Sequence, residues 1–412
     1  MTTTKVLLRG MFRKYYQSTR PRPPTDIQRR EFAFTFFGQK GMFRHRGMIS
    51  ADQYHAYLVK FAPEHAYVSA ALYQKPEAPD MDAKGWMGCD FVFDIDCDHL
   101  PTDCKQVHDR WQCAACEFAG RGSPPPQCPG CGERKFASLN WVCDRCLGAA
   151  KEETLKLIED FLEPDLGISK NEMTVAFSGH RGYHVHVETD EYRQLDQEQR
   201  RELVDYVRGT GVSLKVLGLY EDKENVHGVL RDAPGWGGKI ARFLESFLEK
   251  ATAEELAAVE GLSPRYARAL HDVKREILGR IRSDNTNWTV RGVGMATFEK
   301  LAEHAVATIA PDVDVPVSLD VHRLIRLVDT LHGKTGLRVV EVPPNALAEF
   351  DPLKDALAFG TAEVTVKVTA KPFSPAFRIS DASYPEFPDG TAVTLPADAA
   401  AFLLCKGAAE VP

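Results

Sequence analysis

The chain has 412 residues, of which 44% are hydrophobic and 26% are charged, as in an ordinary globular protein with two or more domains. A formal net charge of −7 argues against charge-driven adhesion to nucleic acid over the whole surface, although it permits a local basic cleft. No apolar run approaches the length of a membrane span, and the N-terminus lacks the apolar core of a signal peptide, so we expect a cytoplasmic protein that contacts no membrane.

The first part of the chain predicts a helix followed by a β-hairpin. The helix is expected around residues 11–17. Alternating apolar residues at 30–36 predict a strand, and 42–46 predict its antiparallel partner after a glycine turn. On facing strands, Glu31 and Arg44 would form a salt bridge or border a site.

Residues 91–96, Phe-Val-Phe-Asp-Ile-Asp, carry the first sign of chemistry. In a strand, Asp94 and Asp96 leave the same face, while both phenylalanines and the isoleucine leave the other. Two carboxylates one pleat apart repel each other unless a cation lies between them, and hard oxygen ligands favour Mg²⁺ or Mn²⁺. The pair therefore predicts a divalent metal site, with two solvated aspartates at a strand end as the alternative.

Seven of the ten cysteines fall between residues 104 and 146, which indicates bound metal rather than disulfides in a chain without a secretion signal. The spacing defines an inner set of Cys113, Cys116, Cys128 and Cys131, and an outer set of Cys104, His108, Cys143 and Cys146. His99 is a competing ligand for His108 in the outer set. Closed sets of four such ligands are typical of structural zinc, so we expect two zinc ions.

A second chemical segment is the Ser-Gly-His-Arg-Gly turn at residues 178–182 and the strand after it. Glycine lets backbone amides approach an anion closely, and the Ser178 hydroxyl and the Arg181 guanidinium would converge on the same anion. On the strand, His184 and His186 alternate with two valines, so that one face presents two imidazoles. The combination favours phosphate binding over a pair of structural histidines.

An amphipathic helix is expected at 151–162, and the pattern from 191 to 310 is helical, with basic residues on a solvated face rather than on a DNA-binding track. Strands are expected at 337–342 and around 364–368, followed by a loop-rich tail.

Basic residues gather again near position 330. We expect a helix that carries Arg323 and Arg326 one turn apart, followed by His332 and Lys334 in a glycine-containing loop. These side chains would place several cationic donors together. An aspartate just upstream would complete the metal site begun by Asp94 and Asp96.

Five motifs in this order together resemble the catalytic small subunit of the archaeal and eukaryotic replicative DNA primase, in its archaeal form. They are Arg30-Glu31-Phe32-Ala33-Phe34, Phe93-Asp94-Ile95-Asp96, Ser178-Gly179-His180-Arg181-Gly182-Tyr183-His184, Arg323-Leu324-Ile325-Arg326 and Leu331-His332-Gly333-Lys334-Thr335-Gly336-Leu337. The resemblance implies an α/β (α+β) primase catalytic fold with mixed sheets. It places the catalytic domain at 1–190 and 311–412, a zinc-binding insertion at about 99–147, and a mainly helical subdomain at 191–310.

The resemblance also implies an activity and partners. Such an enzyme is a nucleotidyltransferase, a DNA-directed RNA polymerase that uses two metal ions and nucleoside triphosphates to synthesise short RNA primers on a single-stranded DNA template. Archaeal members often use deoxynucleotides as well. The implied partners are the large primase subunit, in a heterodimer, and other replication proteins. Two alternatives remain open at this point: a primase-polymerase of repair or of a mobile element, and a non-enzymatic zinc-ribbon adaptor for nucleic acid.

Site residues follow from the resemblance position by position. Asp94, Asp96 and Asp314 match the metal-binding carboxylates, with Asp320 as the second candidate for the third ligand. The matching nucleotide contacts are Ser178, Arg181, His184, Arg323, Arg326 and His332, with Glu31 and Arg44 near the initiating nucleotide. The outer cysteine set matches the zinc knuckle of the family, and the inner set is an apparent insertion within it. Val328-Asp329-Thr330 stands where archaeal relatives usually have Pro-Gly-Ser.

Overall fold

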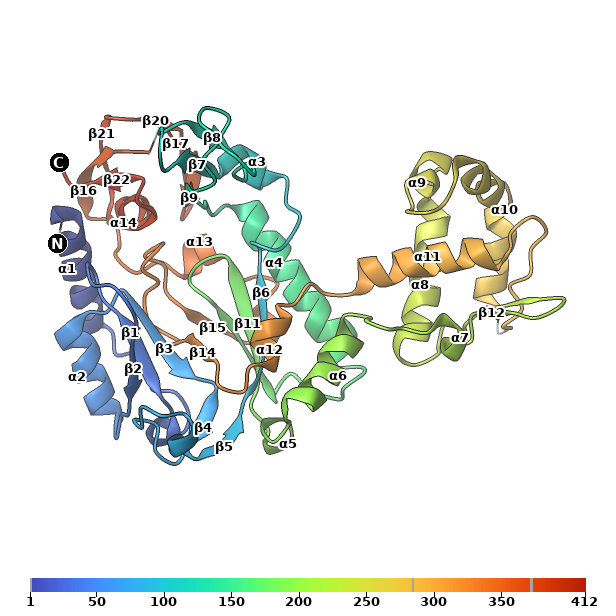
Figure 1. Cartoon of the computed structure of the whole chain (residues 1–412), viewed down its shortest axis with the longest axis horizontal. Coiled ribbons are helices and arrows are strands. Elements are labelled where there is room, and N and C mark those ends of the chain that lie inside the picture. The colour runs from blue at the N-terminus through green and yellow to red at the C-terminus, as the bar shows by residue number, and fades with distance from the viewer. Residues whose placement is uncertain (1, 284, 371–372) are drawn as a thin grey trace. The chain divides into compact units, whose positions relative to one another are not determined.

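The computed structural model describes residues 2–283, 285–370 and 373–412, and the chain forms two compact units (Figure 1). The first unit comprises Met1–Thr154, Ser169–Arg200 and Val313–Pro412, and the second comprises Leu155–Ile168 and Arg201–Asp312. Among the residues described, no helix combines the length and the apolarity needed to cross a bilayer.

Two four-stranded sheets form the centre of the first unit. Their strand orders are β14 (Leu324–Arg326), β3 (His65–Ser69), β1 (Phe32–Thr35), β2 (Phe43–Arg46), and β15 (Val340–Val342), β10 (Met173–Phe177), β11 (Gly182–Val187), β6 (Phe91–Asp96). Side chains from both sheets line the same cavities, so the sheets face each other. The α/β class is confirmed, although every pairing between the described strands of these two sheets is antiparallel rather than mixed in direction.

The N-terminal elements follow the sequence prediction closely. The expected helix lies within α1 (Thr3–Ser18), and the expected hairpin is formed by β1 and β2. The aromatic residues of β1 pack against α2 (Ala51–Phe61): the ring centroids of Phe34 and Tyr57 are 4.6 Å apart. Burial of these rings fixes the outer face of the first sheet and leaves its other face free to line the cavities.

Two predictions in the C-terminal third were wrong. Arg323 and Arg326 do not lie on a helix, because Leu324–Arg326 forms β14 and pairs with β3. The loop-rich tail instead contains α14 (Ala397–Lys406), an alanine-rich helix that is almost entirely buried. In both cases a tertiary contact outweighs the local sequence pattern. Ile325 pairs with the edge of β3. Phe402 packs against Trp141, with ring centroids 5.3 Å apart, and this burial stabilises the short helix.

Smaller elements complete the first unit, and residues 155–162 and 201–207, which end two of these helical segments, belong to the second. The helix expected at 151–162 is the end of α4 (Asp144–Leu157) with a π-helical continuation at Ile158–Leu162, and the expected C-terminal strands are β15 and β16 (Glu363–Val368). β16 pairs with β21 (Ala392–Pro396) and β22 (Ala409–Glu410), and the cysteine-rich segment contains α3 (Cys104–His108), β7 (Arg110–Cys113), β8 (Ala119–Arg121) and β9 (Phe136–Leu139). Further short elements are β4 (Ala71–Tyr73), β5 (Trp86–Cys89), α5 (Asp190–Arg193), α6 (Gln197–Val207), α12 (Val315–Leu319), α13 (Pro352–Asp355), β17 (Phe373–Ser374), β18 (Phe377–Ile379), β19 (Ala382–Tyr384) and β20 (Phe387–Pro388).

Helices form most of the second unit. Its long helices are α8 (Gly235–Lys250), α10 (Pro264–Arg282) and α11 (Met295–Ile309), with α7 (Leu214–Leu217), α9 (Ala253–Ala257) and the hairpin of β12 (Tyr220–Glu221) and β13 (Val226–His227). The buried ammonium of Lys239 lies 2.7 Å from the carboxylate of Asp165 and anchors α8. Arg282, at the end of the basic helix α10, pairs with Glu245 and Glu249 of α8, so this basic residue is neutralised by acidic neighbours.

Candidate functional site

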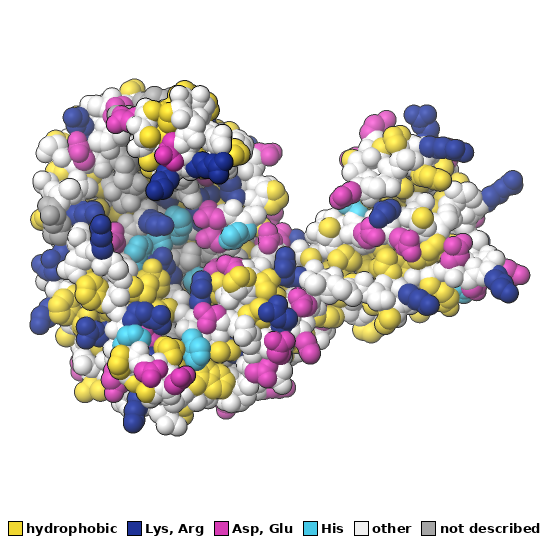
Figure 2. Space-filling view, viewed as in Figure 1, with side chains coloured by type: hydrophobic (Ala, Val, Ile, Leu, Met, Phe, Trp, Pro, Cys, Tyr) yellow, Lys and Arg dark blue, Asp and Glu magenta, His cyan; other side chains and the backbone are white. Residues whose placement is uncertain are grey.

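A cavity of about 200 Å³ lies between the two sheets of the first unit, beside the end of β6. We call it the carboxylate cavity. Figure 2 shows histidine and acidic side chains gathered in a hollow of this unit. Seven of the residues predicted for the site line this cavity, although they come from four separate parts of the sequence: Asp94, Asp96, Ser178, His184, Arg323, Arg326 and His332.

The acidic side of the cavity is built on β6. Asp94 and Asp96 leave the same face of the strand, as the alternation predicted. Asp314 does not line the cavity, but its backbone amide donates a hydrogen bond to the carbonyl of Asp94 at 2.8 Å. Burial, and then the negative charge of Asp314, raise the pKa of Asp94 to about 6. Asp320, the other candidate, instead accepts a hydrogen bond from the amide of His322 at 2.9 Å.

The carboxylates of Asp94, Asp96 and Asp314 are spread over some distance. Among the described residues, three groups of possible metal-ligand atoms each lie within 4.8 Å of one another, and these three carboxylates are not one of the groups.

The basic side of the cavity is organised by Arg326. Its guanidinium carbon lies 4.4 Å from the centre of the Tyr67 ring, and its Nη1 atom lies 2.7 Å from Nδ1 of His65. The same Nδ1 atom accepts the amide proton of Gly333 at 3.2 Å. His65 therefore accepts two hydrogen bonds at one nitrogen and holds the guanidinium and the His332 loop in fixed positions.

Burial lowers the pKa values of the histidines that line the cavity. The His332 ring stacks on the His180 ring at 4.9 Å and contacts His65 edge-on at 4.7 Å. Burial, and then the positive charge of Arg326, hold the pKa of His332 well below its usual value. Burial and the same arginine lower the pKa of His184 to about 4, and its Nε2 atom lies 3.4 Å from the carboxylate of Asp94. The positive charge facing the aspartates therefore comes from arginine.

The glycines of the Ser-Gly-His-Arg-Gly turn are needed for close packing. Gly179 has a positive φ of 76°, and a Cβ atom there would lie 2.8 Å from Cβ of His332. A Cβ atom on Gly182 would lie 2.1 Å from the carbonyl oxygen of Ile95. The Ser178 hydroxyl oxygen accepts the amide protons of His180 and Gly182, at 3.4 and 3.3 Å. The turn thus fits tightly between β6 and the His332 loop.

Arg181 lies in a different place from the other predicted nucleotide contacts. Its side chain is fully buried and does not line the carboxylate cavity. The guanidinium is 2.6 Å from Asp98 and 3.7 Å from Asp109, and its Nε atom donates to the sulfur of Cys97 at 3.4 Å. Arg181 therefore faces the cysteine-rich segment.

Glu31 and Arg44 form the salt bridge that was expected as one of two outcomes, with Nε and Oε1 3.1 Å apart. The Glu31 carboxylate also accepts the amide proton of His45 at 3.0 Å and pairs with the buried ammonium of Lys84 at 3.2 Å. Neither member of the pair lines the carboxylate cavity. Glu31 is fully buried and Arg44 is half-exposed, so only the arginine is available to a ligand.

The outer cysteine set comes together as predicted, with His108 rather than His99 as its fourth member. The Cys104 and Cys146 sulfurs are 3.4 Å apart, and Nε2 of His108 is 3.2 Å from the Cys146 sulfur. Nδ1 of His108 lies 2.7 Å from the carboxylate of Asp109, which orients the ring with Nε2 toward the sulfurs. This set could hold a metal ion such as zinc.

The inner cysteine set also comes together, around the β7 sheet. Sulfur pairs Cys113–Cys131 and Cys116–Cys128 are 3.6 and 3.5 Å apart. The amide of Gly130 donates to the sulfur of Cys128 at 3.4 Å, the contact expected at a zinc-ribbon turn. The third group of possible ligands is Asp96, Cys97 and Asp98, which extends β6 toward Arg181.

Three contributors to the cavity region were missed by the sequence reasoning. They are His65, His180 and Lys406, whose ammonium lies 3.2 Å from Nε2 of His180. Burial, and then the charge of Arg181, lower the pKa of Lys406 to about 7. Lys406 lies in the segment that was predicted as a loop, and His65 lies in an ordinary-looking strand, so no pattern marked either residue.

Comparisons with known proteins point to one family. A family model described as DNA primase small subunit matches residues 133–344. The chain is 35% identical over 432 residues to the DNA primase small subunit PriS of Methanothrix thermoacetophila, and the match covers 99% of each chain. It is 33% identical to the protein of the same name from Archaeoglobus fulgidus, over 99% of this chain and 98% of the relative. The corresponding Methanospirillum hungatei protein is 31% identical over 99% and 97%.

The raised pKa of Asp94 predicts that its charge destabilises the metal-free fold. A folded-state pKa of about 6, against 3.8 as the ordinary value, corresponds to at most about 3 kcal/mol. Because the shift is upward, the fold is most stable below about pH 4, where Asp94 is protonated. This stability is lost as the pH rises through the folded-state pKa of about 6. In urea unfolding without Mg²⁺ or Mn²⁺, Asp94→Asn should therefore be more stable than wild type at pH 7.5, with a difference that shrinks toward pH 5. The exposed Asp389→Asn serves as the control. An Asp94→Asn protein less stable than wild type at pH 7.5 would contradict this account.

Proposed function

Because this chain belongs to the DNA primase small subunit family, we propose that the carboxylate cavity is where it joins nucleotides into a primer. Members of the family are nucleotidyltransferases that synthesise RNA primers, and this chain is the catalytic subunit of a DNA primase that acts in DNA replication. One observation carries the proposal for the site: Asp94 and Asp96 share a small cavity with Arg323, Arg326 and His332.

The acidic residues suit divalent cations. Asp94, Asp96 and Asp314 would hold Mg²⁺ or Mn²⁺, since burial and mutual repulsion leave Asp94 in need of a positive partner. When bound, two such ions lower the pKa of the attacking 3′-hydroxyl and neutralise charge that builds on the α-phosphate and the departing pyrophosphate.

The opposite wall would hold the nucleoside triphosphate. Arg326 and Arg323 supply charge and fixed donors for phosphate oxygens, and Ser178 adds its hydroxyl. The uncharged rings of His184 and His332 offer hydrogen bonds without further positive charge. The residues would align the α-phosphorus with the primer 3′-oxygen, so positioning and charge stabilisation supply most of the rate.

Other predicted residues take supporting roles in the proposal. Arg44 would contact the initiating nucleotide, with buried Glu31 orienting it. Arg181 is assigned a positioning role, because it reaches Asp98 and Cys97 on the segment that follows Asp96. The catalytic domain would correspond to the first unit and the helical subdomain to the second. We expect the chain to work in the cytoplasm with a large primase subunit, replication proteins, nucleoside triphosphates and a single-stranded DNA template.

The metal assignment is tested by three matched aspartate variants. Asp94→Asn and Asp96→Asn should each abolish metal-dependent incorporation of labelled nucleotide on a single-stranded template, because each removes a negative ligand from the cavity. Asp98→Asn should reduce incorporation much less than Asp96→Asn does, because Asp98 does not line the cavity and acts on it only through Arg181. If Asp98→Asn is as damaging as Asp96→Asn, the ion is held by the Asp96–Cys97–Asp98 group and the proposed ligand set is wrong.

His65 provides a test of the triphosphate wall. His65→Leu removes the acceptor shared by Arg326 and Gly333, so we expect KM for the nucleoside triphosphate to rise about tenfold with a smaller change in kcat. Asn places an oxygen near the position of Nδ1, so His65→Asn should keep most of the affinity. Equal KM values for His65→Leu and His65→Asn would show that His65 does not position Arg326.

The cysteine sets predict two zinc ions per chain. Elemental analysis of the purified protein should give two zinc ions, and Cys128→Ser and Cys146→Ser should each reduce the content to one. Cys89→Ser is the matched control, because the buried Cys89 belongs to neither set, and it should retain both ions. A wild-type content of one zinc would mean that one of the two sets is not a zinc site.

A further inference from the structure

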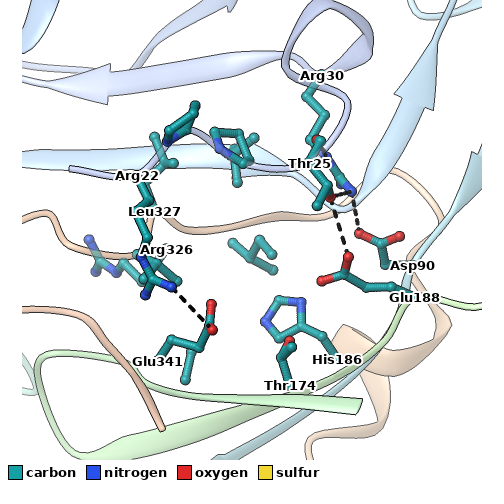
Figure 3. Close-up of a pocket in the computed structure, with 16 residues that line it drawn as sticks. Arg22, Thr25, Arg30, Asp90, Thr174, His186, Glu188, Arg326, Leu327 and Glu341 are labelled. Carbon is teal, nitrogen blue, oxygen red and sulfur yellow. Dashed lines mark hydrogen bonds and ion pairs between the residues drawn. The ribbon is translucent and has the colours of Figure 1, made fainter. Parts of the chain in front are cut away.

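A second cavity, of about 240 Å³, lies between the same two sheets (Figure 3). The strand β14 lies between it and the carboxylate cavity. Ile325 and Arg326 of β14 line both cavities. We call the second space the His186 cavity. None of the residues assigned to the metal ions lines it. Its size lies just below the roughly 300–1,000 Å³ typical of drug-sized ligands, so it suits a small molecule.

The charged groups around the His186 cavity are matched with one another. Arg30 is 2.7 Å from the carboxylate of Asp90, and both side chains are almost fully buried. Arg22 lies 3.4 Å from Glu341, as Figure 3 shows. The lining contains three arginines and three carboxylates. The charges just outside it balance as well, because Arg193 pairs with Asp90 and Glu188, and Asp329 pairs with Arg22. The cavity therefore has no large excess of either charge for a phosphate or an ammonium group.

His186 is a buried polar group without a partner in the protein. It is 7% exposed, it points into the cavity in Figure 3, and its ring nitrogens have no hydrogen bond to any residue that the structure describes. Thr174, its register partner on β10, also lines the cavity, and its hydroxyl has no recorded hydrogen bond within the described part of the chain. Buried polar groups are normally paired, so the buried His186 ring and the half-buried Thr174 hydroxyl beside it are both available to a ligand in the cavity.

The polar groups have a defined hydrogen-bonding character. Burial, and then the neighbouring His184, lower the pKa of His186 to about 3, so the ring is neutral and presents one donor and one acceptor. Glu188 accepts a hydrogen bond from the Thr25 hydroxyl at 3.3 Å and retains further acceptor capacity. Between these groups the walls are apolar, formed by residues such as Pro23, Val68 and Ile325.

We propose that the His186 cavity binds an uncharged nucleoside, with its base between the apolar walls and its polar edge on His186, Thr174 and Glu188. A base combines flat apolar faces with donors and acceptors at its edge, which matches this lining. The balance of charge disfavours a nucleotide phosphate. Because Arg326 belongs to both cavities, an occupant here would also change the affinity of the carboxylate cavity for its own ligand.

The experiment measures nucleoside binding without catalysis, so its outcome is independent of the proposed function. Adenosine and guanosine are titrated into the full-length protein without Mg²⁺ or Mn²⁺ and followed by calorimetry, with inorganic phosphate as the anionic probe. We expect at least one nucleoside to bind more tightly than phosphate. Thr174→Val, which keeps the shape of the side chain, and Glu188→Gln should each weaken nucleoside binding about tenfold.

Two further variants locate the bound nucleoside. The exposed Thr361→Val is the matched control and should bind as wild type does. His332 lines the carboxylate cavity and not the His186 cavity, so His332→Ala should also retain nucleoside binding. Loss of binding in His332→Ala with normal binding in Thr174→Val would place the nucleoside in the carboxylate cavity and overturn the proposal. Absence of nucleoside binding to the wild-type protein, or tighter binding of phosphate, would overturn it as well.

Discussion

The antiparallel pairing of β6 with β11 is the constraint on which the rest of the site depends. Its register sets Asp94 opposite His184 and Asp96 opposite Gly182. Asp94 thereby lies beside an imidazole and Asp96 beside a glycine. The glycine is required, because a side chain at Gly182 would collide with the backbone of β6. A slip of one residue would turn every one of these side chains to the other face of the sheet. The two faces are not equivalent, since the opposite one buries Phe91, Phe93 and Ile95 completely.

The site is held in an electrostatically incomplete state. Burial favours the neutral forms of both kinds of group, so it raises the pKa of Asp94 and lowers the pKa values of His184 and His332. Arg326 remains as a fixed positive charge, held by His65 and Tyr67. A metal ion beside the carboxylates and a polyphosphate beside the arginines would each supply the charge that the protein leaves uncompensated. This arrangement favours binding of the two together.

Local patterns sufficed for those parts of the site that lie within single elements. Strand alternation predicted the shared face of Asp94 and Asp96, and cysteine spacing predicted both ligand sets. The residues that join these elements could not be found in this way. The segment around Arg326 was expected to be a helix, yet its backbone pairs with β3, a partner more than 250 positions away in the chain. Arg181 lies in a motif that is typical of phosphate binding, but its guanidinium pairs with Asp98 and Asp109 instead.

The central claim is that Asp94, Asp96 and Asp314 gather cations opposite Arg326 and His332. A crystal structure of the protein with Mn²⁺ and a non-hydrolysable nucleoside triphosphate, with the metal located by anomalous scattering, tests it most directly. The account predicts manganese bound by these three carboxylates and the triphosphate on Arg326 and His332. Manganese on Asp96, Cys97 and Asp98 without Asp94, or a triphosphate that does not contact Arg326, would contradict it.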